Sequence, residues 1–461
     1  MKISVEPSQK LSIILLTRIS QTASRRFALC KRFYNREMLC RTVHPYRALG
    51  EERGRTVWHH LRRNSFRHRW ITDAFLRSHE KCGLTMRICL CFLLSGASAC
   101  SRAAKPVSNT WACMGTYASL TLSADEEAAL DSASATAAAS LCDLDNRLSI
   151  FKPDSEISRL NRSAGASPVQ ISAMTENMLQ LSTHYSEATD GTFDPTVAPL
   201  MRLWGFNKGP PLSVVPDSSA ISSVLERVGY HHLSVSNGAA FLDREGMGID
   251  LGGIGKGYAV DVCYEALVTN NIKNLMVNLG GHIRCRGSAG PGRPWSIGIR
   301  DPFDHDRIVG TLRLSDGMAV ATSGNYEKFF MLDGKRYIHI MNPLTGYPVE
   351  GVASVTIIAD SAVKADAMTK PFFVLGLDKS LPILARTPNC HVIFIPDERP
   401  TRIYISPGVR KYFTPDSSFD GQILDINQNT HERLPRCKSA QTSRARRSVG
   451  GGLVETGFLV G

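Results

Sequence analysis

The spacing of apolar and small residues along the chain indicates three helices. Residues 124–146 are rich in Ala and Leu, with Ser123 or Asp125 placed to cap a helix. Residues 175–189 show similar helical spacing and end before a Gly turn. A third helix is expected to begin near Ser361, where small and apolar residues again dominate.

Short apolar runs bounded by turn-forming residues indicate strands. They lie at residues 275–279, 295–299, 308–314, 352–358, 392–396 and 402–406. Because helices and strands mix without a regular strand–helix–strand alternation, we expect an α+β fold with mixed or antiparallel sheets and flanking helices, rather than a doubly wound fold. We expect one body over residues 113–415.

The charge of the chain is unevenly distributed. The net charge is +12 over 461 residues, and residues 1–85 alone carry 18 Lys or Arg against 6 Asp or Glu. The remainder is therefore neutral, which argues against a nucleic-acid partner. Residues 1–85 are either a basic arm for an anionic partner or a segment upstream of the true start at Met86. The second interpretation is favoured, so this leader is predicted to be non-native or disordered.

Residues 86–100 have the order of a secretory signal, with a basic start, a short apolar run and small residues before Cys100. This order also resembles a bacterial lipoprotein box, in which the cysteine thiol carries a diacylglycerol. The run is too short for a spanning helix, which needs about 20 apolar residues. The alternative is a buried strand or a helix start. We expect a lipid anchor at Cys100, a tether over residues 101–112 and a disordered tail over residues 416–461.

A glycine-rich motif, IDLGGIGKGYAVD, spans residues 249–261. It joins a strand-like run to a helix expected to begin at Tyr258. Glycines before a helix let backbone N–H groups approach a phosphate, and the helix dipole favours the anion. Asp250 and the positive charge of Lys256 add polar groups. The motif indicates a phosphate site, and a turn that needs glycine only for its geometry is the alternative.

His339 lies in the segment YIHIMNPLTGYP, on an expected strand that precedes the turn-forming pair Asn342-Pro343. An isolated histidine is more often structural than catalytic. Here Ser323-Gly324 and Thr345-Gly346 supply further polar turns, and active-site loops have this composition. His339 is therefore a candidate catalytic residue.

Asp366 and Lys370 are four residues apart on the third expected helix and share one face. A surface ion pair is the simplest interpretation. The flanking residues are apolar, however, and this indicates burial. A buried carboxylate needs a cation or a metal as its partner, and Mg²⁺ accepts carboxylates, waters and substrate phosphates.

The segment TDGTFDPTVAPLMRLWGF, residues 189–206, contains Trp204 and Phe206. Either aromatic ring is able to stack on a flat ligand, but buried aromatic residues usually belong to the core. The core interpretation is favoured.

Together these segments resemble the ApbE family of flavin transferases. The motifs occur in the family's order from GTY at 115–117 through FKPDSEISRLN, DGTFDPT, LWGF, the glycine motif, NLGG, WSIGIRDP and ATSGNYEKFF to KADAMTKPFFVLG, over roughly residues 113–405. The resemblance implies a single catalytic body. It also implies an Mg²⁺-dependent enzyme that cleaves FAD, moves FMN to a threonine hydroxyl of a flavoprotein subunit of a membrane redox complex, and releases AMP.

The resemblance also assigns roles to residues at the matching motif positions. The positions that bind FAD are Met114, Phe151, Thr192, Phe193, Asp194, Asp250, Lys256, Ile340 and Thr369. His339 matches the general base, and a histidine suits this role because its ordinary pKa lies near 6.5. The carbonyl of Gly253 and the carboxylate of Asp366 match magnesium ligands. Hydroxyl attack on a pyrophosphate needs charge neutralisation, positioning and a proton acceptor.

Three residues depart from the family pattern. Lys370 stands where the family usually has Thr or Ser as a further metal ligand, with Thr369 one residue earlier. His282 follows NLGG where the family often has Asp, and Gly255 replaces a common Ala. An ammonium at position 370 either weakens metal binding or replaces part of the metal's charge.

The leading hypothesis is an FMN transferase, lipid-anchored to the inner membrane of a bacterial envelope and facing the periplasm. One alternative is an FAD pyrophosphatase that gives FMN and AMP at the same site. A second alternative, from a different class, is a flavin-binding lipoprotein with little catalysis.

Overall fold

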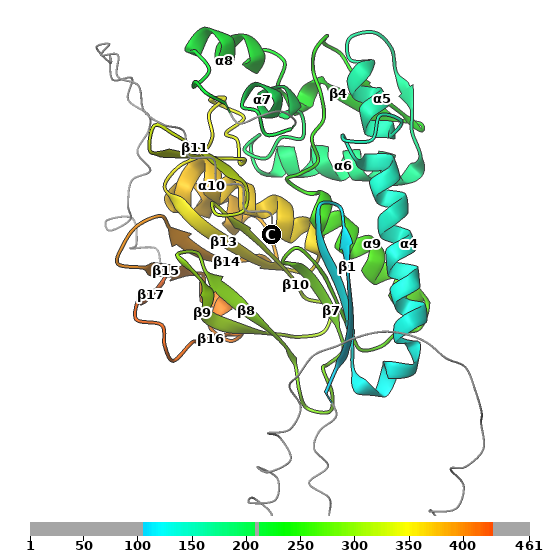
Figure 1. The fold of residues 1–461 in the computed structure, drawn as a ribbon, viewed down its shortest axis with the longest axis vertical. Helices are drawn as coiled ribbons and strands as arrows, with labels where there is room; N and C mark the ends of the chain where they lie inside the picture. Colours follow the sequence, from blue (N-terminus) through cyan, green and yellow to red (C-terminus); the bar gives the residue numbers. More distant parts are fainter. Residues whose placement is uncertain (1–104, 208–211, 427–461) are drawn as a thin grey trace, which may run out of the picture. The chain divides into compact units, whose positions relative to one another are not determined.

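A computed structural model describes residues 105–207 and 212–426, shown in Figure 1. Its largest element is a nine-stranded sheet with the order β1-β2-β6-β7-β10-β13-β14-β15-β17. Neighbouring strands are antiparallel, except that β15 and β17 are parallel. The strands are β1 (Val107–Cys113), β2 (Thr116–Leu122), β6 (Leu275–Leu279), β7 (His282–Arg286), β10 (Ala319–Gly324), β13 (Val352–Ala359), β14 (His391–Pro396), β15 (Arg402–Ile405) and β17 (Gln422–Asp425).

Three smaller sheets accompany the large one, with the orders β16-β9-β8, β3-β5-β4 and β11-β12. Their strands are β3 (Val169–Gln170), β4 (Leu233–Ser236), β5 (Ala239–Leu242), β8 (Trp295–Asp301), β9 (Asp304–Leu314), β11 (Phe329–Leu332), β12 (Lys335–Ile338) and β16 (Phe413–Pro415). The hairpin β11-β12 leads directly into the segment that carries His339.

The α-helices are α4 (Leu130–Leu148), α5 (Glu156–Arg162), α6 (Ala173–Ala188), α7 (Ala198–Leu203), α8 (Ser218–Leu225), α9 (Gly255–Thr269) and α10 (Ala362–Ala385). Three short 3-10 helices, η1 (Ala124–Ala129), η2 (Tyr230–His232) and η3 (Pro407–Val409), complete the described elements. α10 packs on β10 and β13, while α9 packs between α10 and α4. The two helices that carry the glycine motif and the Asp366 motif are therefore neighbours.

Strand β13 shows why the centre of the sheet is apolar without alternation. All eight of its residues are buried. Val355 and Ile357 pack in one cluster with Phe372 of α10, whereas Ile358 packs in another cluster with Leu312 of β9. A strand covered on both faces is expected to be a continuous hydrophobic run.

The α+β fold expected from the sequence is confirmed. The helix expected at 175–189 is α6, and the strand expected at 275–279 is β6. Two local expectations were wrong. The glycine motif enters its helix at Gly255, three residues before Tyr258, and His339 lies just after β12 rather than on a strand.

The sheet extends beyond the expected body of 113–415 at both ends. β1 begins at Val107, inside the expected tether, and β17 ends at Asp425, inside the expected tail. β1 belongs to the sheet because every residue of β1 is paired with a residue of β2. The leader over 1–85 and the signal over 86–100 lie outside the described residues. Within the described ranges, no helix combines the length and apolarity needed to cross a membrane.

Candidate active site

The glycine motif is joined to the 189–206 segment at Asp250. The Asp250 backbone N–H donates to the carbonyl of Pro195 at 2.7 Å, and its Oδ1 accepts from the Gly252 N–H at 2.8 Å. Burial raises the pKa of Asp250, while the Gly252 N–H and the charge of Lys328 oppose that shift. Asp250 therefore holds the turn that leads into α9.

The first turn of α9 meets the first turn of α10 at Gly257. A Cβ added to Gly257 would lie 2.2 Å from the carbonyl oxygen of Ala362, so only glycine permits this approach. The Gly257 N–H donates to Asp366 Oδ2 at 3.0 Å. The glycine at this position is thus required to bring Asp366 to the N-terminus of α9.

Asp261 makes the reciprocal contact, from α9 to α10. Its two carboxylate oxygens accept from the backbone N–H groups of Ala362 and Val363 at 2.9 and 2.8 Å. Arg284 donates to the same carboxylate at 3.0 Å. Each helix thus supplies the aspartate that caps the other. Asp261 was visible in the motif, but its capping role follows only from the packing.

Asp366 is fully buried and binds Lys370 directly. The Lys370 Nζ lies 2.7 Å from Asp366 Oδ1, 2.9 Å from the Asp366 carbonyl oxygen and 3.0 Å from Thr369 Oγ1. Burial alone would raise the pKa of Asp366, but Lys370 and the neighbouring His282 outweigh it and hold that pKa well below its usual range. Burial lowers the pKa of Lys370, and Asp366 opposes that shift.

His282, the first residue of β7, lies on the other side of Asp366. Its Nε2 is 3.2 Å from Asp366 Oδ1, and its side chain is 2% exposed. Neither ring nitrogen is aligned for a hydrogen bond with another described residue. Burial, together with Lys256 and Lys370, lowers the pKa of His282. The Asp366 carboxylate opposes this shift of the His282 pKa.

Thr369, assigned to FAD by resemblance, is completely buried. Its hydroxyl lies 2.8 Å from Ser323 Oγ and 2.8 Å from the Asp366 carbonyl oxygen. This hydroxyl therefore fixes the first turns of α10 against β10. The same hydroxyl accepts from the Lys370 ammonium, so Thr369 belongs to the buried cluster around Asp366.

His339 is half-buried beside β11 and β12. The Lys328 carbonyl accepts from the His339 backbone N–H at 3.0 Å and lies 3.1 Å from Nδ1. Since a carbonyl only accepts, Nδ1 carries the proton and Nε2 has a free lone pair. Loss of hydration and the charges of Lys256, Lys328 and Lys370 lower the pKa of His339. The lowered pKa keeps Nε2 unprotonated near neutral pH.

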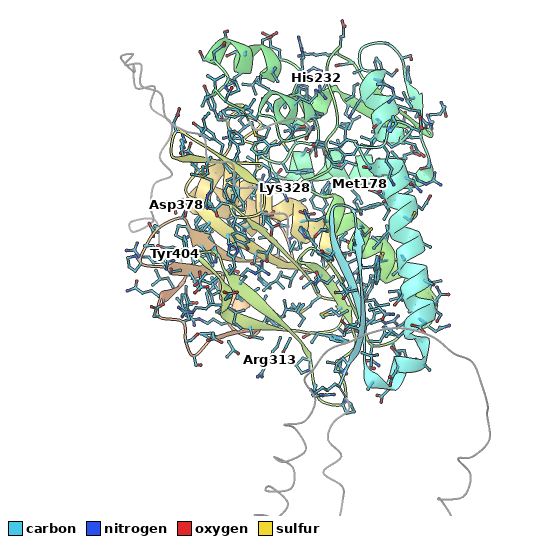
Figure 2. The ribbon with its side chains drawn as sticks, viewed as in Figure 1. Met178, His232, Arg313, Lys328, Asp378 and Tyr404 are labelled. Carbon is cyan, nitrogen blue, oxygen red and sulfur yellow. The ribbon has the colours of Figure 1, made fainter. Side chains whose placement is uncertain are left out.

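Three lysines thus act on His339 from three different elements. Lys256 is in the first turn of α9, Lys328 precedes β11, and Lys370 is on α10. Figure 2 labels Lys328. The N-terminus of α9 adds the partial positive charge of its backbone N–H groups. The positive charge around His339 suits an anionic ligand such as a pyrophosphate.

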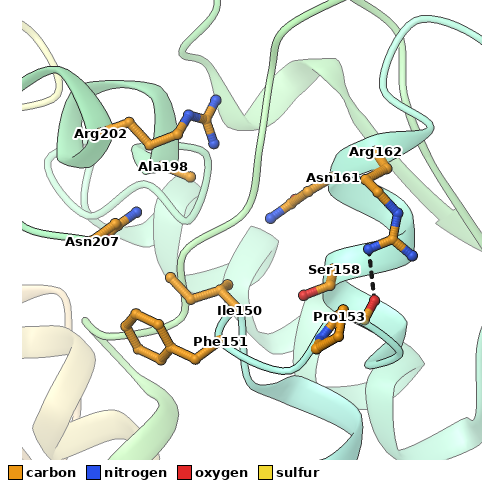
Figure 3. Close-up of a pocket in the computed structure, with 9 residues that line it drawn as sticks. All are labelled: Ile150, Phe151, Pro153, Ser158, Asn161, Arg162, Ala198, Arg202 and Asn207. Carbon is orange, nitrogen blue, oxygen red and sulfur yellow. Dashed lines mark hydrogen bonds between the residues drawn. The ribbon is translucent and has the colours of Figure 1, made fainter. Parts of the chain in front are cut away.

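A cavity of about 610 Å³ lies between α5, α7 and the loop after α4. Phe151, Asn161, Arg202 and Asn207 line it, as Figure 3 shows. Phe151 is 53% exposed. The side chain of Asn207 lowers the pKa of Asp250, which links the cavity wall to the glycine motif.

Asn161 is a functional candidate that the sequence reasoning missed. Its side-chain amide donates to the Ile249 carbonyl at 2.9 Å, and its Oδ1 accepts from the Ile249 N–H at 2.6 Å. The Asn161 side chain thereby satisfies both backbone polar groups of Ile249, as a neighbouring strand would. Ile249 is the first residue of the glycine motif. The only sequence signal was its place in the FKPDSEISRLN segment.

The 192–194 triplet lies beneath the glycine motif. Phe193 is 3% exposed, and its ring would meet a Cβ at Gly253 at 3.1 Å. Both oxygens of Asp194 accept hydrogen bonds, from Thr196 at 2.7 and 2.6 Å and from the Tyr230 N–H at 2.9 Å. Thr192 Oγ1 donates to the Thr189 carbonyl at 2.7 Å. These contacts shape the loop.

The remaining candidates lie around these groups. Met114 has a positive φ of 49° in the turn between β1 and β2, where Gly115 follows. Ile340, next to His339, is 7% exposed. Trp204 is completely buried, and its Nε1–H donates to the Gly346 carbonyl at 2.8 Å. The favoured interpretation of Trp204 as a core residue therefore agrees with its position.

The residues present do not fit a magnesium ion between Gly253 and Asp366. Asp366 Oδ2 accepts from Gly257, and Oδ1 is bonded to the Lys370 ammonium. The Lys370 Cε would lie 3.3 Å from a Cβ at Gly253, so this side chain passes beside Gly253 before its ammonium reaches Asp366. Mg²⁺ needs oxygen ligands at about 2.0–2.1 Å in octahedral geometry. Among the described residues, no cluster of three His, Cys, Asp or Glu is arranged to hold a metal.

Comparison with known proteins identifies a family model and relatives that match the chain. The model of the ApbE family matches residues 114–394. An FAD:protein FMN transferase of Klebsiella pneumoniae (strain 342) is 31% identical over 331 residues, which are 70% of this chain and 95% of that protein. An FAD:protein FMN transferase of Escherichia coli (strain K12) is 34% identical over 247 residues, which are 52% of this chain and 70% of that protein.

Solved structures agree in fold. The ApbE protein from Thermotoga maritima is 30% identical with a TM-score of 0.61, and the match covers 67% of this chain and 99% of that one. The flavin transferase ApbE from Vibrio cholerae is 30% identical with a TM-score of 0.60 and the same coverage. The chain belongs to the ApbE family.

Proposed function

We propose that this protein is an FAD:protein FMN transferase, which moves FMN from FAD to a threonine hydroxyl of a partner protein and releases AMP. The names of its relatives support this proposal. The observation that carries it is His339, whose Nδ1 is held by the Lys328 carbonyl and whose pKa is lowered by burial and by the charges of Lys256, Lys328 and Lys370. The proposed acceptor is a flavoprotein subunit of a membrane redox complex.

The chemistry uses these groups in one displacement. The threonine oxygen attacks the phosphorus of the FMN half, and a new P–O bond forms. The bond from that phosphorus to the bridging oxygen breaks, and this oxygen leaves with AMP. His339 Nε2 takes the hydroxyl proton. Lys256 and the first turn of α9 hold the phosphates and stabilise the charge that develops. Magnesium, which the family resemblance implies, enters no step because Lys370 fills its expected position.

The experiment is incubation with FAD and an acceptor protein that carries the target threonine. Flavin fluorescence on the acceptor in a denaturing gel supports transfer. FMN and AMP without labelled acceptor would replace the proposal with FAD hydrolysis. Intact, tightly bound FAD would replace it with flavin binding alone.

His339→Ala tests the assigned base. We expect FAD binding to persist and transfer to fall by about 10²–10⁴-fold, because general-base catalysis contributes that much. His184→Ala is the matched control, since His184 is an exposed histidine on α6. Transfer at the wild-type rate in the His339 variant would remove this residue from the mechanism.

The proposed location is the inner membrane of a bacterial envelope, with the protein on the periplasmic side and a lipid anchor on Cys100. The short apolar run and the small residues before Cys100 support this proposal. Mass spectrometry of the mature N-terminus is the direct test. A diacylated Cys100 is expected in the wild type, and Cys100→Ala is expected to appear in the soluble fraction. An N-terminus upstream of residue 86 would contradict the proposal.

A further inference from the structure

Lys370 passes beside Gly253 and bonds to Asp366, the two residues expected to bind the metal. Three oxygen atoms surround its ammonium at 2.7, 2.9 and 3.0 Å, two from Asp366 and one from Thr369. An ammonium has three donor hydrogens, so each has an acceptor within reach. The ammonium is thus fully coordinated by protein oxygens.

The burial of this pair makes the arrangement persistent. The Asp366 side chain is 0% exposed and that of Lys370 is 12% exposed. Removing one partner of a buried pair leaves an uncompensated charge, which costs several kcal/mol. A divalent ion at Asp366 would have to displace the ammonium and then remain beside it. Coulomb repulsion opposes this outcome strongly in a poorly hydrated site.

The surrounding charges replace what a metal would supply. The Asp366–Lys370 pair is neutral overall, so Asp366 does not repel an approaching pyrophosphate. Lys256 and Lys328 act on the same His339 that Lys370 does, and neither forms an ion pair with another residue in the described part of the chain. Both ammonium groups are therefore available to an anion, together with the N-terminus of α9.

We propose that Lys370 is a built-in cation that takes the place of the divalent metal at Asp366, so that this protein binds FAD without Mg²⁺. The inference rests on the proposed function for its role in transfer, but the binding of metal is independent of transfer. It also accounts for the position of Lys370 beside Gly253 and Asp366. The family usually has a Thr or Ser metal ligand at this position, and here the residue carries a positive charge of its own.

The first test is Mn²⁺ binding by the full-length protein with FAD bound. The electron paramagnetic resonance signal of free Mn²⁺ measures how much of the ion the protein binds. FAD alone at the same concentration is the reference. We expect the wild type to remove no more Mn²⁺ than this reference does. Lys370→Thr should gain a Mn²⁺ site, and Asp366→Asn combined with Lys370→Thr should lose it again.

Lys364→Thr is the matched control, because Lys364 lies on the same helix and pairs with Asp360, whose side chain is 49% exposed. It should gain no Mn²⁺ site. A wild-type Mn²⁺ site that Asp366→Asn abolishes would overturn the proposal. This wild-type measurement decides the matter even if Lys370→Thr does not fold.

The second test is FAD affinity in EDTA and in Mg²⁺, measured by quenching of flavin fluorescence. We expect the same affinity in both conditions for the wild type. Loss of FAD binding in EDTA, with recovery in Mg²⁺, would overturn the proposal. Lys370→Met should weaken FAD binding by roughly tenfold or more, since it exposes the ligand to an unpaired Asp366.

Transfer is measured separately, with EDTA or Mg²⁺ present. Equal labelling of the acceptor in both conditions agrees with the inference. If no acceptor is labelled in either condition, the proposed transfer fails, while the Mn²⁺ and FAD titrations still decide the role of Lys370.

Discussion

Asp261 and Asp366 lie in corresponding places at the junction of α9 and α10, and they have different surroundings. Asp261 caps α10 with two backbone hydrogen bonds and one from Arg284. Asp366 caps α9 with a single backbone hydrogen bond. Its other oxygen faces Lys370 and His282 instead. Both oxygens of Asp261 accept backbone hydrogen bonds, whereas one oxygen of Asp366 is bonded to a cationic side chain instead.

The comparison separates a structural carboxylate from one that belongs to a site. Asp261 has a side chain that is 14% exposed, and its Arg284 partner also reaches Glu265 at the surface. Asp366 is completely enclosed, and it borders a histidine whose nitrogens lack aligned partners. Buried, incompletely matched polar groups mark functional sites, since stability alone does not favour them.

Substitution of Asp366 is expected to have the largest effect on stability. Asp366→Ala leaves the Lys370 ammonium buried without a partner, so we expect a loss of about 3–5 kcal/mol in the free energy of unfolding. Urea denaturation measures it. Asp366→Asn combined with Lys370→Met should recover most of this loss. A change below about 1 kcal/mol in the Ala variant would show that Asp366 does not hold Lys370.

Substitution of Asp261 is expected to have a smaller effect, which is confined to stability. Asp261→Ala removes the cap of α10, which costs about 0.5–2 kcal/mol for typical helix caps. FAD affinity should stay close to that of the wild type, because this carboxylate is occupied by the backbone of α10 and by Arg284. Parallel urea denaturation and fluorescence titration measure both quantities. A large drop in FAD affinity with little loss of stability would contradict the division between the two aspartates.

The smallest expected effect concerns His339 and pH. Its pKa is lowered in the folded protein, whereas in the unfolded chain a histidine binds a proton near pH 6.5. The stability that results is present above that pH and is lost as the pH falls. Because His339 is only half-buried, we expect a loss of about 1 kcal/mol between about pH 7 and pH 5.

His339→Gln should remove this dependence, and the exposed His184→Gln should leave it unchanged. Urea denaturation at several pH values compares the three proteins. The same lowered pKa should keep transfer active below about pH 6.5, since the base stays neutral there. An identical pH slope for wild type and His339→Gln would show that the ring titrates alike in the folded and unfolded chains.

Much of the fold was accessible from local pattern. The strand expected at 275–279 coincides with β6, and the helix expected at 175–189 overlaps α6 except at its ends. Helical spacing and buried apolar runs are local properties of the chain, so they can be read without a structure. The start of α9 was misplaced because glycines carry no helical signal, although Gly257 is required for its packing.

The sequence by itself determined the α+β class, the order of the motifs and the candidates His339, Asp366 and Lys370. The tertiary structure decided how these groups pair. Asn161 meets Ile249 across 88 residues, and Gly257 meets Asp366 across 109 residues. Contacts of this kind depend on how close two helices approach and which atoms remain for a neighbour. For that reason only the packed structure shows that the Lys370 ammonium is bonded to the buried Asp366.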